Sequence, residues 1–183
     1  KPASARAEYQ WRSEGSVRAA MITNDETDIA TGLGPEDGAG DLGVPFQNNE
    51  TTALRLQATE APLNDIRVRQ AIRLALDVDQ LLLAGFNGKV PRLNSLIMQP
   101  ILGYWADAPV YKRNVAEAKR LLAEAGQTAI KARLTVLNQP ANQTMALVAQ
   151  ALLREVGITI EVDAQDGGTY WDSGKGDTGK NLD

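Results

Sequence analysis

The clearest hydrophobic pattern in the chain is a strand, a helix and a second strand in its C-terminal third. Apolar and polar residues alternate over 132–136 and again over 158–162, which is typical of half-buried strands. Between them, apolar side chains recur at helical spacing over 140–156, and Gly157 follows where a helix end favours glycine. Two strands joined by a helix in this way are parallel, with a right-handed crossover. The pattern therefore predicts an α/β fold built of βαβ units with a mostly parallel sheet.

Helices are also predicted upstream of this unit. A short one is expected over 16–23. The next opens at Asn64 or Asp65, whose side chain can accept the free N–H groups of the first turn, and carries a regular apolar stripe. A third follows from Asp77 or Asp79.

The segment 114–126 gives the strongest single helix prediction. Asn114 precedes its apolar stripe and Glu117 stands three residues later, the spacing of a capping box, in which each side chain bonds the other residue's N–H. Short strands are predicted over 28–30 and 51–57, where apolar residues alternate with polar ones.

Composition narrows the possible functions. The 183 residues include 19 Lys and Arg, 23 Asp and Glu, and no Cys or His, for a formal net charge of −4. A disulfide framework, a thiolate nucleophile and a Ser-His-Asp triad within this chain are therefore excluded. The acidic balance disfavours nucleic-acid binding, and no apolar run is long enough to insert into a membrane. The length fits one domain over residues 1–183.

Neutral polar side chains gather where the first strand of the βαβ unit ends. Ligands of open α/β sheets bind outside the carboxyl ends of the strands, so Asn138, Asn142 and Gln143 are the candidate ligand-binding residues. We expect Trp105, from the long proline-bounded connection 87–111, to lie behind them. The alternatives are that the amides bond their own turn and that Trp105 only packs the connection onto the domain.

Three other features have a structural explanation beside a functional one. Residues 174–180 fit the phosphate-loop pattern G-x-x-x-x-G-K, but Asn rather than Ser or Thr follows, so a solvated loop is favoured. Arg67 and Arg69 could clamp an anion, but pairing with carboxylates or helix-end carbonyls is favoured. Asp163 and Asp166 fit surface charge better than a metal site. No catalytic residue, metal or cofactor is expected.

Four segments in the same order resemble the extracellular solute-binding proteins of peptide and nickel ABC importers, family five. They are similar to its PF-D-VRVRQAI-AID signature, its Y…EKAKELLAEAG segment, its LT…AQ-IQ-QL-VGI-V stretch and its GE-DIA motif. The matching residues are Pro62-Leu-Asn-Asp65-Ile-Arg67-Val-Arg69-Gln-Ala71-Ile72 with Ala75-Leu-Asp77, Tyr111 with 117–126, 134–160, and Glu26-Thr27-Asp28-Ile29-Ala30.

The resemblance implies a periplasmic-binding-protein-like fold of type II, in which two α/β lobes close over a ligand. This chain would be part of the C-terminal lobe. The implied function is capture of a peptide-like solute and its delivery to a membrane permease. The implied location is the periplasm, or the outer cell surface with an anchor outside this segment. Nickel chelates, opines and oligosaccharides stay open as ligands.

Two other function classes stay open at this point: a lobe of a small α/β enzyme using carboxylate or Lys chemistry, and a structural or interaction domain. A concave edge at 138–143 would favour the binding lobe, and a flat, sealed edge the structural domain. One lobe offers half of the ligand contacts of a closed pair, so we expect weak or undetectable affinity from this chain alone.

Overall fold

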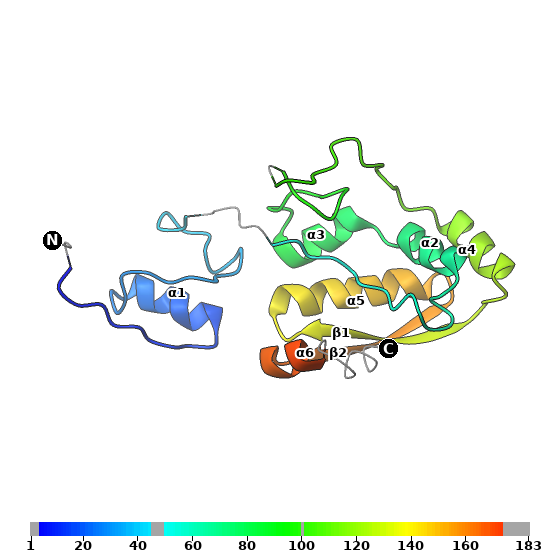
Figure 1. Cartoon of the computed structure of the whole chain (residues 1–183). Coiled ribbons are helices and arrows are strands. Elements are labelled where there is room, and N and C mark those ends of the chain that lie inside the picture. Colours follow the sequence, from blue (N-terminus) through cyan, green and yellow to red (C-terminus); the bar gives the residue numbers. More distant parts are fainter. Residues whose placement is uncertain (1–3, 45–49, 100, 174–183) are drawn as a thin grey trace. The chain divides into compact units, whose positions relative to one another are not determined.

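The computed structural model describes residues 4–44, 50–99 and 101–173, and it divides into two compact units (Figure 1). Unit 1 is Lys1–Gln47 and unit 2 is Asn48–Asp183. The length predicted one domain over 1–183, whereas the contacts within the chain group its residues into two units. The assignment to part of a C-terminal lobe stays a prediction.

Unit 1 contains one helix in its described residues, α1 (Gly15–Thr23), as predicted. The guanidinium of Arg18 holds the surrounding chain by donating to the backbone carbonyls of Arg12, Ser13, Thr31 and Gly32 at 2.7–3.2 Å. The strand predicted over 28–30 is wrong. Strands are stabilised by pairing, and unit 1 has no other strand among its described residues.

Unit 2 is built on the predicted βαβ crossover. Strands β1 (Ile130–Leu137) and β2 (Ile158–Gln165) pair in parallel, with Ile130 opposite Ile158, and α5 (Pro140–Arg154) connects them. Gly157 turns the chain from α5 into β2 with φ 88°, and a Cβ there would stand 2.6 Å from the carbonyl oxygen of Thr128. Only glycine meets both requirements without strain.

The core of unit 2 lies where α2 (Ile66–Ala75) and α4 (Val115–Glu124) meet α5 and the two strands. In Figure 1, α5 lies along the sheet and α2 and α4 lie side by side near one end of α5. The stripes predicted for α2 and α4 supply much of this core, but Ile130 and Leu153, which the sequence did not single out, also belong to it. Its buried members are Val68, Ala71, Ile72, Ala75, Ala118, Leu122, Ile130, Leu153, Val156 and Ile158. Burial of these stripes is the main stabilising contribution to the unit.

Of the helix starts that the sequence left open, the structure selects Asp65 over Asn64 and Asp77 over Asp79. Asp65 accepts from the N–H of Arg67 at 2.8 Å, and Asp77 caps α3 (Val78–Phe86) through the N–H groups of Asp79 and Gln80. These bonds satisfy donors that a helix cannot satisfy internally.

The structural explanation of the paired arginines is also confirmed. Arg67 bonds the Asp65 carboxylate and, at 2.7 Å, the carbonyl of Glu124, while Arg69 donates to the carbonyls of Leu63 and Asn64. Arg67 thus ties the start of α2 to the end of α4.

Asn114 forms only half of the predicted capping box. Its Oδ1 accepts from the N–H of Glu117 at 3.0 Å, but its own N–H donates to the carbonyl of Leu74, and the Glu117 carboxylate turns to Arg120 instead. The Asn114 N–H, which a capping box would bond to the Glu117 side chain, instead bonds a carbonyl of α2. The start of α4 is therefore anchored to α2 at this residue.

Two segments differ from expectation. Residues 51–57 are not a strand. Leu56 packs against the core, while Leu54 is 40% exposed, so the alternation reflects one inward residue rather than sheet pairing.

A helix that the sequence did not predict, α6 (Gly167–Ser173), follows β2. The phosphate-loop match at 174–180 lies outside the described residues.

Candidate functional site

The carboxyl ends of β1 and β2 bring together two of the predicted site residues and one that the sequence did not single out as a ligand group. The N–H of Asn138 donates to the carbonyl of Gln165 at 2.8 Å, which extends the ladder beyond β1. The Asn138 amide then donates to Asp166 Oδ1 at 3.1 Å and accepts from Gln143 Nε2. We call Asn138, Gln143 and Asp166 the strand-end network.

The sequence contained the signal for Asp166. In the parallel register Leu137 stands opposite Gln165, so the residues that directly follow them reach the same edge. Sequence reasoning assigned Asp166 to surface charge because it considered carboxylates near each other along the chain and not across the strands.

The two remaining predicted residues are not part of this network. Asn142 lies in the first turn of α5 and its amide donates to Gln139 Oε1 at 3.5 Å. Trp105 is 57% exposed, in the connection 87–111. Figure 1 shows that connection beyond α3, with α3 and α5 between it and the sheet. Of the expected amides, the structure therefore joins Asn138 with Gln143 only.

One buried acceptor near this edge lacks a hydrogen-bond partner among the described residues. Gln165 donates through Nε2 to Asp163 Oδ2 at 2.8 Å, while its Oε1 is buried and unsatisfied. An unsatisfied buried acceptor has a free-energy cost. The described residues contain no group of three or more His, Cys, Asp or Glu side chains placed to hold a metal ion.

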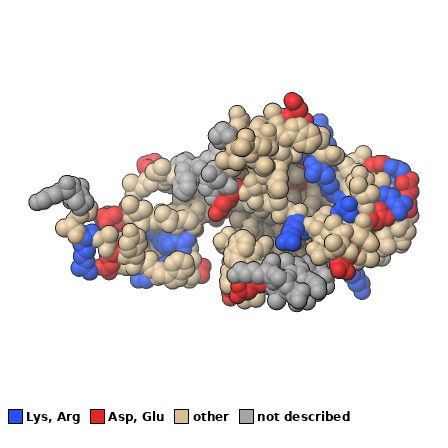
Figure 2. Space-filling view, viewed as in Figure 1, with Lys and Arg blue, Asp and Glu red and all other residues tan. Residues whose placement is uncertain are grey.

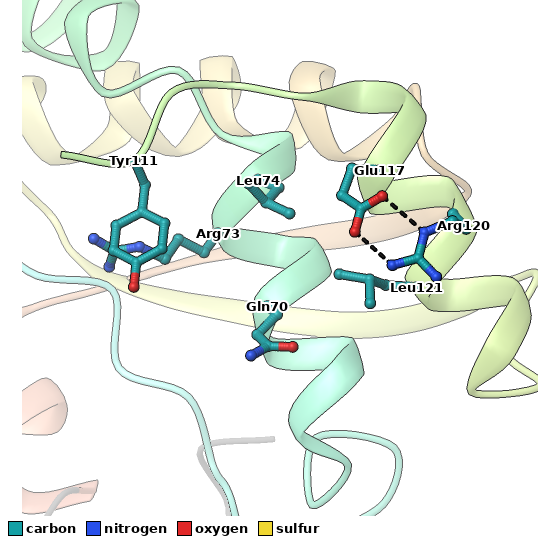
Figure 3. Close-up of a pocket in the computed structure, with 7 residues that line it drawn as sticks. All are labelled: Gln70, Arg73, Leu74, Tyr111, Glu117, Arg120 and Leu121. Atoms are coloured by element: carbon teal, nitrogen blue, oxygen red, sulfur yellow. Dashed lines mark hydrogen bonds and ion pairs between the residues drawn. The ribbon is translucent and has the colours of Figure 1, made fainter. Parts of the chain in front are cut away.

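The hollows of the surface lie elsewhere in unit 2. One of about 330 Å³ lies between α2 and α4 (Figure 3). Another of about 320 Å³ is lined by Thr128, Glu155 and Gly157 among others, at the end where the strands begin. Neither includes a member of the strand-end network. The concave edge at 138–143 that would favour a binding lobe is therefore not among these two hollows, and the strand end is marked instead by its hydrogen-bonding side chains.

Side chains of both charges lie close together near the first hollow. Figure 2 shows Lys and Arg intermixed with Asp and Glu at the end of unit 2 that carries α4. Hydrogen bonds from Arg120 lower the pKa of Glu117, and Glu117 and Glu124 together raise the pKa of the Arg120 guanidinium. At the start of α2, the side-chain and backbone bonds from Arg67 lower the pKa of Asp65 to about 2.

The parallel βαβ unit with a polar strand end places unit 2 in the α/β class. The chain belongs to the bacterial extracellular solute-binding proteins of family 5, whose middle-region model matches residues 1–179. The family resemblance drawn from the sequence is therefore confirmed, as is the α/β class with a parallel sheet.

Curated relatives and solved structures agree with this placement. The chain is 27% identical over 171 residues to a dipeptide-binding protein of Escherichia coli K12, covering 86% of this chain and 32% of that protein. It is 32% identical over 127 residues to the periplasmic oligopeptide-binding protein OppA of Salmonella typhimurium, covering 62% of this chain and 23% of that one.

Two solved structures show the same fold. The periplasmic binding protein AgaA of A. tumefaciens R10, in complex with agropinic acid, matches with a TM-score of 0.79 at 24% identity, over 93% of this chain and 36% of that one. DppA of Helicobacter pylori, in complex with the peptide STSA, matches with a TM-score of 0.74 at 23% identity. The match covers 87% of this chain and 32% of that one. The chain thus spans about a third of the length of these proteins.

The part of the chain that the structure describes contains no helix with both the length and the apolar character needed to cross a bilayer.

Proposed function

We propose that this chain is part of the C-terminal lobe of a two-lobed solute-binding protein. That protein captures a peptide-like solute between its lobes and passes it to the permease of an ABC importer. The observation that carries the proposal is the strand-end network, which places hydrogen-bonding groups at the carboxyl edge of a parallel sheet in a chain of this family. The names of its relatives, which are dipeptide- and oligopeptide-binding proteins, support the peptide class. The names of OppA and of the Helicobacter pylori DppA, both of which include the word periplasmic, support a periplasmic location.

The chemistry of the edge suits a peptide backbone. A peptide presents N–H donors and carbonyl acceptors in alternation, and an amide side chain can satisfy both. Asp166 adds an acceptor with negative charge. Asn142 and Trp105 stay predictions as ligand contacts; both belong to unit 2, so closure of a second lobe would not change their distance from the strand-end network. Capture of this kind is non-covalent and requires no catalytic group.

Nuclear magnetic resonance of the 15N-labelled chain tests the proposal, with a defined mixture of di- and tripeptides as the probe. We expect saturable shifts of the backbone amides of Asn138, Gln143 and Asp166, with Kd about 1 mM or weaker, because one lobe supplies only part of the contacts. Shifts confined to other residues at about 20 mM peptide would contradict the assignment of the edge. Micromolar binding measured by calorimetry would contradict the two-lobe mechanism.

Substitutions sharpen this test. Gln143→Ala removes one donor from the network and should weaken the peptide titration, whereas Gln80→Ala, which removes an exposed amide from α3, should leave it unchanged. Equal effects of the two substitutions would show that the network takes no part. Peptide hydrolysis or any other turnover by the chain would favour the enzyme-lobe alternative.

A further inference from the structure

The hollow between α2 and α4 has an apolar floor and two polar walls. Each helix contributes residues at spacings of three and four, so they lie on one face: Gln70, Arg73 and Leu74 from α2, and Glu117, Arg120 and Leu121 from α4. Tyr111, just before α4, closes the remaining side. Figure 3 shows Arg73 and Tyr111 at one end and the pair of Glu117 and Arg120 at the other.

The two arginines of this hollow are in different electrostatic states. Arg120 is neutralised, because its guanidinium bonds both oxygens of Glu117 at 2.6 and 2.8 Å and also bonds Glu124. For Arg73 the described contacts include no carboxylate, only the ring of Tyr111, with the guanidinium carbon 3.8 Å from the ring centroid. The hollow therefore presents one positive charge at the Tyr111 end that has no acidic partner among the described residues.

The stacking of Arg73 on Tyr111 orients this charge. A guanidinium that lies on an aromatic ring has one face covered, while its N–H donors stay in the plane and point outward. Two parallel donors in that plane match the two oxygens of a carboxylate. The side chains of Leu74 and Leu121 form the floor beside it, and Gln70, one turn before Arg73 on the same face, offers a further amide donor.

We propose that the hollow between α2 and α4 binds a small organic carboxylate with an apolar body, held by the outward edge of Arg73 and by contact with Leu74 and Leu121. A volume of about 330 Å³ lies at the lower end of the range for small-molecule sites. The site is distinct from the strand-end network and independent of the proposed solute capture. Because Arg73 is exposed, water screens its charge and binding is weak.

Phenylacetate and its neutral analogue phenylacetamide are the matched probes, followed by nuclear magnetic resonance of the 15N-labelled chain. We expect phenylacetate to shift the backbone amides of Leu74, Tyr111 and Leu121 and to bind about fivefold more tightly than phenylacetamide, the preference that one exposed ion pair gives. Acetate, which lacks the apolar body, should bind more weakly than phenylacetate.

Two charge-removing variants complete the test. Arg73→Gln should abolish the preference for the anion, while Lys131→Gln, on an exposed position of β1 that lines neither hollow, should preserve it. Equal binding of the two probes, an unchanged preference in Arg73→Gln, or no shift at about 20 mM phenylacetate would overturn the proposal. Asn138→Ala should leave the phenylacetate titration unchanged, which separates this site from the proposed solute site.

Discussion

Replacement of Gly85 by alanine tests how closely α3 packs on α5. A Cβ at this position would stand 2.6 Å from Cγ and 3.0 Å from Sδ of Met145, and 3.2 Å from the backbone oxygen of Ala141. Carbon atoms in contact lie about 3.5–4.0 Å apart, so Met145 would have to move by about 1 Å. Its Cγ lies near the backbone and has little freedom to do so, because α5 is fixed by the sheet.

Two opposing effects decide the sign of the change. Glycine to alanine within a helix stabilises by up to about 1 kcal/mol, and less in the last turn, where Gly85 lies. Overpacking costs about 1–3 kcal/mol. We therefore expect Gly85→Ala to lower the free energy of unfolding by about 1–2 kcal/mol, measured by urea unfolding followed by far-UV circular dichroism.

A double-mutant cycle isolates the contact. In a Met145→Ala background the two closest atoms are absent and only the 3.2 Å approach to the Ala141 oxygen remains, so the Gly85 substitution should become close to neutral, giving a coupling energy of about 1–2 kcal/mol. Gly168→Ala is the matched control, since this helical glycine has no atom within 4 Å of an added Cβ, and it should be neutral or stabilising. If Gly85→Ala alone stabilises as much as the control, the close approach of α3 to α5 is refuted.

Three further changes test the helix starts and the core. Leu153→Ala, at a residue 1% exposed, should destabilise unit 2 by about 2–5 kcal/mol in urea unfolding; a loss under 1 kcal/mol would contradict its central place. Asn114→Ala removes the bond to Glu117 and should cost about 1 kcal/mol, whereas Asn114→Ser should retain most of it. The pKa of Asp65 is lowered to about 2 in the folded chain, below its value in the unfolded chain. Asp65 therefore contributes its full stabilisation when the pH is above the unfolded pKa, and this contribution is lost as the pH falls from about 4 to 2. Asp65→Asn should therefore show a smaller loss of stability than the unchanged chain in urea unfolding over that range, and equal losses would refute the pairing with Arg67.

Local signals predicted the elements whose stability depends on their own residues. Asp65 and Asp77 begin helices where the sequence placed them, because a carboxylate that accepts the first N–H groups acts within two or three residues. The βαβ unit was predictable for the same reason, since its strands and helix each carry an unbroken period. The strand over 51–57 failed because period alone does not provide a pairing partner.

The candidate sites were only partly predictable. The position of Asn138 and Gln143 at a strand end follows from chain order, but the bond to Asp166 depends on the register of two strands. The hollow between α2 and α4 gave no signal in the sequence. Its residues come from three separated segments, and only packing of the two helices places Arg73 on the ring of Tyr111.

The sequence by itself determined the family, the approximate positions of α1 to α5 and the parallel crossover, because each depends on motifs and periods within a short stretch of chain. The tertiary structure alone decided which polar groups find one another. The N–H of Asn114 donates to the carbonyl of Leu74 rather than to the Glu117 side chain. Arg120 pairs with Glu117 and Glu124, whereas the described contacts of Arg73 include no carboxylate. Hydrogen bonds and charges act over a few ångströms in space, so their partners are fixed only when the core has packed.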